Sequence, residues 1–302
     1  MSDFRCGFVA VIGRPNVGKS TLVNALVGAK VAITSSRPQT TRRVLRGIVT
    51  TEEFQLILVD TPGVHRPRTL LGERLNAEVT DAVAGVDVVG LCLPADEAIG
   101  PGDRRIAASI GGRPCVAILT KVDTVSRDVV VARLSELAAF EQELGAQWSA
   151  IVPVSAARGE NLEALRAALV ACLPEGPALF PTDRPTDEPI DVSIAELIRE
   201  AALEGAREEL PHSIAVVVDE VTPRDRRPEQ GPLTDVHAEI FVERDSQKAI
   251  IIGKNGVRLK EIGSQARRGI EGLLGTAVFL DLRVKVAKDW QRDPRQLRRL
   301  GL

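Results

Sequence analysis

The feature that most constrains this chain is a glycine-containing loop near its N-terminus. The pattern GxxxxGKS is matched by the segment Gly13-Arg14-Pro15-Asn16-Val17-Gly18-Lys19-Ser20. An apolar run at Phe8–Ile12 precedes it and a helical pattern at Lys19–Val27 follows, which is the context in which this pattern binds phosphate. Main-chain N–H groups of such a loop face one phosphate chain, and the helix N-terminus favours an anion. We therefore predict an α/β fold with a phosphate site from Gly13 to Thr21.

The chain divides at a proline-rich stretch. Five prolines lie between Pro174 and Pro189. Proline fixes φ and removes a hydrogen-bond donor, so no regular element is expected to run through this stretch. A length of 302 residues also suits two domains. We predict a first domain at 1–173, a linker at 174–190 and a second domain at 191–302.

Short apolar runs alternate with helical patterns in the first domain. Strands are predicted at Phe8–Ile12, Phe54–Val59, Val86–Leu93, Cys115–Leu119 and Ala150–Pro153. Helices are predicted at Lys19–Val27, Leu70–Ala84, Arg104–Ile110, Asp128–Glu143 and Leu162–Cys172. Nearly continuous apolar strands suit a sheet that is buried on both faces, so we expect a mostly parallel sheet.

The second domain has a different order of elements. A helix is predicted at Asp191–Glu208, two alternating strands at Ser213–Val221 and Val236–Glu243, and a last strand at Val278–Val286. Helical patterns flank Gly253–Gly256. The order α-β-β-α-α-β predicts a small α+β domain.

Composition and charge exclude several classes of protein. Hydrophobic residues make up 44% and charged residues 26%, which is typical of a globular chain. The four cysteines form no CxxC pair and the three histidines are dispersed, so neither a disulfide framework nor a zinc site is expected. The net charge is −2, yet residues 248–302 carry 13 basic and 5 acidic side chains. This basic segment indicates either a polyanionic partner or a solvated surface.

Two further segments complete a predicted phosphate and magnesium site. Asp60-Thr61-Pro62-Gly63 follows a strand, so Asp60 can hold Mg²⁺ through water while the Gly63 amide approaches a γ-phosphate. Ser20 is expected to ligate the ion directly. The polar stretch from Ser35 to Arg43 is expected to order around the ion, and Thr41 is favoured over Thr40 as its second hydroxyl ligand.

The base of the nucleotide is predicted to be guanine. Thr120-Lys121-Val122-Asp123 follows a strand, and the Asp123 carboxylate can accept two N–H bonds from the guanine edge. Adenine would leave this carboxylate unpaired, which costs roughly 1–3 kcal/mol or more. The Lys121 stem is expected to pack over the base plane. Ser155-Ala156-Ala157 is expected to place a main-chain N–H on the guanine oxygen.

A second glycine motif lies in the basic segment. Gly253-Lys254-Asn255-Gly256 follows two isoleucines and precedes a helical pattern, which fits the GxxG loop with which KH domains grip about four single-stranded nucleotides. Lys254, Arg258 and Lys260 are expected to bind the RNA backbone. Arginines further along the chain either touch RNA or keep the surface soluble: Arg267, Arg268, Arg292, Arg295, Arg298 and Arg299.

Together these motifs resemble the translation-factor-related GTPases and, within them, the Era family of bacterial ribosome-assembly GTPases. The resemblance covers nearly the whole chain. It implies a Ras-like P-loop GTPase domain followed by a type II KH domain, and binding of the 3′ end of 16S ribosomal RNA during maturation of the small subunit. Thr120 departs from the family pattern, which has Asn; we expect its hydroxyl to keep the tie to the P-loop and to lose a purine contact.

The expected reaction is slow hydrolysis of GTP. Lys19, Thr41 and Gly63 are the predicted catalytic positions, and Val64 cannot orient a water as glutamine does, so an intrinsic rate on the order of 10⁻⁴ to 10⁻² s⁻¹ is expected. The resemblance implies that Asn16 helps to hold K⁺. His65 is either a base or, preferably, a solvated residue.

The leading hypothesis is a switch in which GTP orders residues 39–43 and 63–67 and alters the RNA grip of the second domain. A non-catalytic RNA-binding factor that holds GTP or GDP is the alternative. An RNA-modifying GTPase or an ATP-using kinase is less favoured, because no extra catalytic domain is evident and Asp123 disfavours adenine. We expect a cytoplasmic monomer; the family is also reported peripherally at the membrane, which no segment here demands.

Overall fold

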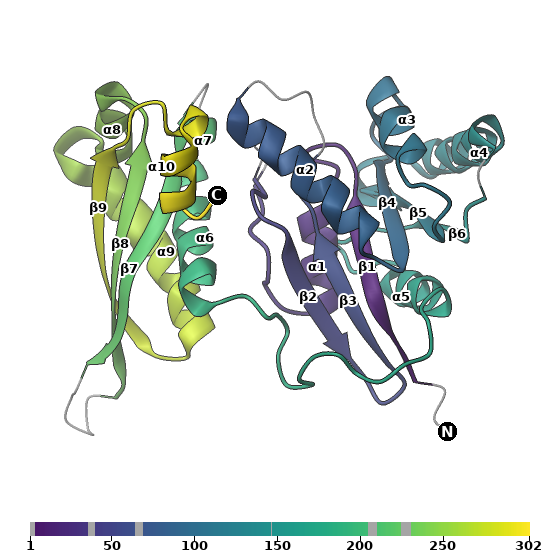
Figure 1. The fold of residues 1–302 in the computed structure, drawn as a ribbon, viewed down its shortest axis with the longest axis horizontal. Helices are drawn as coiled ribbons and strands as arrows, with labels where there is room; N and C mark the ends of the chain where they lie inside the picture. The colour runs from purple at the N-terminus through teal and green to yellow at the C-terminus, as the bar shows by residue number, and fades with distance from the viewer. Residues whose placement is uncertain (1–3, 36–39, 64–68, 146, 205–209, 225–230) are drawn as a thin grey trace. The chain divides into compact units, whose positions relative to one another are not determined.

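The computed structural model describes residues 4–35, 40–63, 69–145, 147–204, 210–224 and 231–302. It divides the chain into two compact units, one made of Met1–Arg68 and Gly72–Asp187 and the other of Thr69–Leu71 and Glu188–Leu302 (Figure 1). Among the described residues, no helix has both the length and the apolarity that crossing a bilayer requires.

A mixed sheet forms the centre of the first unit. Its strands are β1 (Arg5–Ile12), β2 (Leu45–Thr50), β3 (Phe54–Asp60), β4 (Val88–Pro94), β5 (Cys115–Thr120) and β6 (Ala150–Pro153). They lie in the order β2-β3-β1-β4-β5-β6, and only the β2–β3 pair is antiparallel in this sheet. The carboxyl ends of the parallel strands therefore meet at one edge of the sheet, where ligands of such folds bind.

Strand β2 was not predicted from the sequence. Its segment, LRGIVT, contains a glycine and an exposed arginine, and it lies at the edge of the sheet. Gly47 packs so closely on α1 (Lys19–Val27) that an added Cβ would lie 2.7 Å from a Val27 methyl group. The apolar run needed to reveal such a strand is therefore absent.

Helices cover both faces of this sheet (Figure 1). One buried cluster joins Leu22 of α1 and Leu165 of α5 (Leu162–Ala171) to one face. On the other face a second cluster contains residues of α2 (Leu70–Ala84), α3 (Pro101–Ala108) and α4 (Arg127–Leu144). Burial on both faces explains why the central strands are almost continuously apolar.

The proline-rich stretch adheres to the first unit up to Asp187. The Gln55 side chain on β3 is fully buried; its Oε1 accepts hydrogen bonds from the N–H groups of Leu179 (2.8 Å) and Phe180 (2.9 Å). Its Nε2 donates to the Phe180 carbonyl at 2.8 Å. Further along, the Ile48 N–H on β2 donates to the Pro185 carbonyl at 2.8 Å. The predicted linker is thus bound to the first sheet, at β3 through Leu179 and Phe180 and at the edge strand β2 through Pro185.

The second unit has the predicted α-β-β-α-α-β core with short additions. Its elements are α6 (Ile190–Leu203), α7 (Leu210–Ser213), β7 (Ala215–Arg224), β8 (Leu233–Val242), α8 (Asp245–Ile252), α9 (Val257–Leu274), β9 (Ala277–Val286) and α10 (Pro294–Arg299). The sheet order is β7-β8-β9, with β8 and β9 parallel. Fully buried Trp290 donates its Nε1–H to the Ser213 carbonyl at 3.1 Å, which anchors the C-terminal segment.

Candidate functional sites

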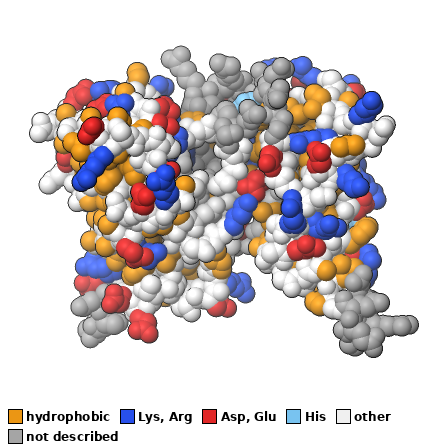
Figure 2. Space-filling model, turned by 180° about the vertical axis from the view of Figure 1, so that it is seen from behind, with side chains coloured by type: hydrophobic (Ala, Val, Ile, Leu, Met, Phe, Trp, Pro, Cys, Tyr) orange, Lys and Arg blue, Asp and Glu red, His pale blue; other side chains and the backbone are white. Residues whose placement is uncertain are grey.

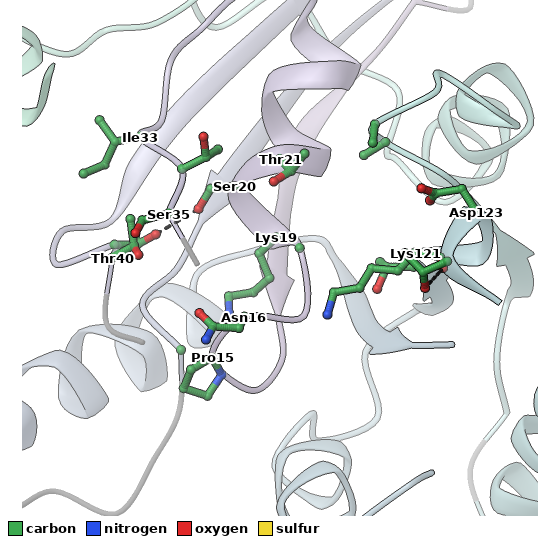
Figure 3. A pocket seen from close by; sticks show the side chains of 18 residues that line it. Pro15, Asn16, Lys19, Ser20, Thr21, Ile33, Ser35, Thr40, Lys121 and Asp123 are labelled. Carbon is green, nitrogen blue, oxygen red and sulfur yellow. Dashed lines mark hydrogen bonds between the residues drawn. The ribbon is translucent and has the colours of Figure 1, made fainter. Parts of the chain in front are cut away.

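The four predicted motifs of the first unit meet around one cavity of about 470 Å³ (Figure 3). It opens at the carboxyl ends of β1, β3, β5 and β6, and its volume suits a small-molecule ligand. Its lining includes Lys19, Ser20, Thr41, Gly63, Asp123 and Ala156. Residues more than a hundred positions apart in the sequence are thus brought to one site by the strand order.

The Lys19 side chain is held inside the P-loop. Its ammonium donates hydrogen bonds to the Gly13 carbonyl at 3.1 Å and to the Arg14 carbonyl at 2.9 Å. The side chain is buried, and this burial lowers the pKa of Lys19 from its ordinary value. An ammonium has three N–H donors. The two carbonyls therefore leave one donor for a phosphate oxygen.

Three oxygen-bearing side chains converge beside Lys19. The Ser20 hydroxyl donates to Asp60 Oδ2 at 2.6 Å and lies 2.9 Å from Thr41 Oγ1. The sequence favoured Thr41 over Thr40, and Thr41 Oγ1 also lies 3.4 Å from the same carboxylate oxygen. Burial raises the pKa of Asp60 to about 6. Its other oxygen, Oδ1, is buried without a hydrogen-bond partner among the described residues.

This cluster fits a magnesium ion. Hydroxyl and carboxylate oxygens are the ligands that Mg²⁺ prefers, and the ion keeps several waters when it binds proteins. A hydrated cation would satisfy the unpartnered Asp60 oxygen and would compensate its buried charge.

The turn after β3 is pressed against the P-loop. A Cβ on Gly63 would lie 2.8 Å from both the nitrogen and the Cα of Pro15, so only glycine fits without a shift. The Thr61 hydroxyl fixes the start of the turn by donating to the Val11 carbonyl at 2.8 Å. Val64, His65 and the expected ordering of residues 64–67 fall outside the described residues, as does Gln39.

Asp123 is held in place by Ser155. The Ser155 hydroxyl donates to Asp123 Oδ1 at 2.7 Å and accepts the Arg158 N–H at 3.1 Å. The main-chain N–H of Ser155 donates to the Glu160 carbonyl, so within this segment it is not the amide that would meet the guanine oxygen. Ala156 and Ala157, which line the cavity, are the residues left to offer an amide there.

Lys121 and Thr120 connect the base site to its surroundings. Lys121 has a left-handed φ of 58°, and its ammonium lies 3.2 Å from Asp96 Oδ2. The Thr120 hydroxyl donates to the Val17 carbonyl at 2.6 Å. This confirms the expected tie between Thr120 and the P-loop.

Not every predicted phosphate ligand has its side chain in the cavity. The Val17 side chain is buried in the core, and Arg14 turns toward α3, where it pairs with Asp103. These two residues can serve a phosphate only through their main chain. Asp103 was not singled out from the sequence, because an aspartate at the start of a helix carries no signal of its distant partner.

The GxxG segment of the second unit forms the turn between α8 and α9. Gly253, Asn255 and Gly256 all have left-handed φ values, of 71°, 53° and 76°. A Cβ on Gly253 would lie 2.6 Å from Arg258 Cβ, so the turn requires glycine there. Lys254 extends from the tip of this turn and is exposed.

Apolar and cationic side chains flank this turn. Ile250 and Val257 are 57% and 56% exposed, which is unusual for large apolar residues unless they meet a partner. Lys260 is also exposed, whereas Arg258 donates to the Glu204 carbonyl and is only partly available. On the face drawn in Figure 2, lysine and arginine side chains lie among acidic ones.

Comparisons with known proteins match both units. A family model described as a 50S ribosome-binding GTPase matches residues 8–121, and a KH domain model matches residues 209–291. The protein GTPase Era of Nocardioides sp. is 60% identical over 300 residues, covering 98% of this chain and 96% of the relative. GTPase Era of Mycobacterium tuberculosis H37Rv is also 60% identical, over the full length of both chains.

Two solved structures share the fold along the whole chain. One is Era in complex with MgGDPNP and nucleotides 1506–1542 of 16S ribosomal RNA, with a TM-score of 0.93, 39% identity and 99% of each chain covered. The other is an Aquifex aeolicus Era variant bound to GDP and AlF₄⁻, with a TM-score of 0.92 and 39% identity, covering 98% of this chain and 99% of the other.

Proposed function

The chain belongs to the Era family of GTPases, and we propose on that premise that it hydrolyses GTP in its first unit and binds the 3′ end of 16S ribosomal RNA with its second. The observation that carries this proposal is the single cavity lined by the P-loop and Asp123, with Asp60 bound behind it to the P-loop Ser20. We propose the small ribosomal subunit as the partner because the Era structure that contains 16S ribosomal RNA matches the whole chain. The family model described as a 50S ribosome-binding GTPase matches only residues 8–121.

Hydrolysis rests on charge stabilisation around the phosphates. Ser20 and Thr41 would hold Mg²⁺ directly and Asp60 through water; when bound, the ion supplies positive charge to the phosphate oxygens. Lys19 offers its remaining N–H to the same group. The Gly63 amide, whose residue packs against Pro15, would meet the γ-phosphate.

Guanine selectivity rests on Asp123. Its carboxylate is oriented by Ser155 and accepts the two N–H groups of the guanine edge. Adenine presents an acceptor where guanine presents a donor, and a site built for hydrogen bonds rejects an analogue that lacks them by a large factor. We expect GTP and GDP to bind and ATP to compete poorly.

Multiple-turnover phosphate release separates a GTPase from a factor that merely holds nucleotide. The assay is run with Mg²⁺ and K⁺, with and without RNA that carries the 3′ end of 16S ribosomal RNA. Slow turnover is expected without RNA. Tight GTP binding with no turnover under any of these conditions would support the non-catalytic alternative.

Asn16 supports a role for potassium. It lines the cavity beside Lys19, with a left-handed φ of 62° that turns the loop there. Its side-chain oxygen would serve a monovalent cation next to the phosphates. Replacing K⁺ by Na⁺ at constant ionic strength should lower turnover, and an unchanged rate would remove this assignment.

The GxxG turn supports RNA binding by the second unit. Its glycines let the backbone approach a sugar-phosphate chain, and the exposed Lys254 supplies positive charge. Crosslinking to total RNA is the test, with Lys254→Asp compared against wild type. Lys288→Asp, an equal charge change at another exposed lysine of this unit, is the control. Crosslinks outside small-subunit RNA would contradict the assignment.

The two activities are coupled in this proposal. GTP would order the predicted segments 39–43, which carries Thr41, and 63–67, which begins at Gly63, and hydrolysis would release them, so that the nucleotide state sets the RNA affinity of the second unit. The measurement is RNA affinity in the presence of GDP and of a non-hydrolysable GTP analogue. Equal affinities would leave two independent activities.

A further inference from the structure

The P-loop arginine is held by a buried carboxylate of α3. Arg14 Nε lies 2.8 Å from Asp103 Oδ1, and Asp103 is only 1% exposed. The second oxygen of this carboxylate accepts the Gly100 N–H at 2.9 Å. Glu97, which is 52% exposed, binds Arg14 Nη1 at 2.8 Å. Asp103 is therefore the buried partner and Glu97 the solvent-facing one.

The path of the arginine side chain is also restricted by packing. A Cβ on Gly102 would lie 2.9 Å from Arg14 Cδ, so the arginine stem lies directly on the first turn of α3. Its Nη2 is buried without a hydrogen-bond partner among the described residues. The guanidinium is thus fixed by Asp103 and by contact, and it points away from the nucleotide cavity.

The main chain beside this arginine supports two groups of the reaction. The Arg14 carbonyl accepts a hydrogen bond from the Lys19 ammonium at 2.9 Å. The next residue, Pro15, is the surface against which Gly63 rests. Asp103, acting through Arg14, therefore holds the part of the P-loop that meets both Lys19 and Gly63.

We propose that Asp103 is a positioning residue for GTP hydrolysis. This inference rests on the proposed function, since it concerns the same reaction. Gly63 is placed to meet the γ-phosphate, which GDP lacks. Loss of Asp103 should therefore affect turnover and the preference for GTP over GDP more than the binding of guanine nucleotides in general.

The first test compares Asp103→Asn with wild type. We expect kcat for phosphate release to fall about tenfold, because small displacements of reacting groups have effects of this size or larger. The GTP-to-GDP affinity ratio should fall, while GDP affinity changes by less than about threefold. Glu143→Gln, an exposed carboxylate paired with Arg104, is the matched control and should match wild type.

A second variant separates positioning from folding. Asp103→Asn leaves the Arg14 charge without its buried partner, which lowers stability. Combining it with Arg14→Gln removes both charges, so the thermal midpoint should recover while kcat and the GTP-to-GDP ratio stay low. If kcat and the GTP-to-GDP ratio recover together with the thermal midpoint, Asp103 is merely structural and the inference is overturned. If wild type binds GTP without turnover, the proposed function fails, and the affinity ratio still tests Asp103.

Discussion

At the scale of one residue, Asp60 is a buried carboxylate that suits a metal site but lowers the stability of the ligand-free folded chain. Its carboxylate is completely buried beside two hydroxyls and Lys19, and burial raises its pKa to about 6. The folded protein therefore holds a proton there at pH values where the unfolded chain has lost it. A bound cation would stabilise the buried negative charge of Asp60, which is why the residue suits a metal-dependent site.

The sign of the resulting pH dependence can be tested with Asp60→Asn. The stability that protonated Asp60 contributes is complete below pH 3.8 and is lost as the pH rises through 6. In ligand-free protein, the free energy of unfolding of the variant should therefore rise relative to that of wild type by about 2–3 kcal/mol between pH 4 and pH 8. Chemical denaturation across this range is the measurement. A difference that does not change with pH would contradict the assignment of the shift to Asp60.

Thr120 offers a second test at the same scale. Its hydroxyl joins the base-recognition strand to the Val17 carbonyl of the P-loop. Thr120→Ala removes this bond, and a hydrogen bond contributes about 1 kcal/mol, so GDP should dissociate about fivefold faster. Stopped-flow release of a fluorescent GDP analogue measures this rate. Thr80→Ala is the control, because its exposed hydroxyl donates to the Asn76 carbonyl within α2 and does not line the cavity; equal acceleration in both variants would contradict the tie.

At the scale of elements, the edge of the first sheet differs most from the prediction. Strand β2 forms this edge, and the proline-rich stretch binds it through the hydrogen bond from the Ile48 N–H to the Pro185 carbonyl. An edge strand without such contacts can pair with strands of other chains. Gln55 joins Thr50 on β2 to the stretch at Phe180. A buried glutamine in an apolar strand therefore marks a segment that lies over the sheet.

This role of Gln55 predicts a large loss of stability in Gln55→Leu. The variant leaves the N–H groups of Leu179 and Phe180 without their acceptor, and each such loss costs about 1–3 kcal/mol. The free energy of unfolding in urea should fall by about 2–4 kcal/mol. Gln142→Leu, at an exposed position on α4, should change it by less than about 0.5 kcal/mol. Equal effects of the two substitutions would contradict the proposed anchor.

At the scale of the whole molecule, positive charge is concentrated at the C-terminal end of the chain. Residues 248–302 carry a net charge of +8 within a chain whose total is −2. RNA affinity should therefore fall steeply as salt rises, since each phosphate contact with a single strand adds about 0.7 to the slope of log K against log salt. Filter binding with Lys254→Ala should show a slope reduced by about 0.7, with GTP turnover in the absence of RNA unchanged. A flat salt response in wild type would exclude the phosphate contacts.

Chemistry that lies within a few consecutive residues was readable from the chain. The P-loop, the DTPG turn, the Asp123 motif and the GxxG turn each depend on neighbouring backbone and side-chain groups, and the α/β and α+β classes of the two domains followed from apolar periodicity. Tertiary structure decided the pairs: Arg14 with Asp103, 89 positions apart, and Gln55 with Phe180, 125 positions apart. Such partners meet only because the strand order places their elements together, and their residue types are common at unrelated surface positions. That is also why the contacts between the proline-rich stretch and the first sheet could not be predicted from the sequence.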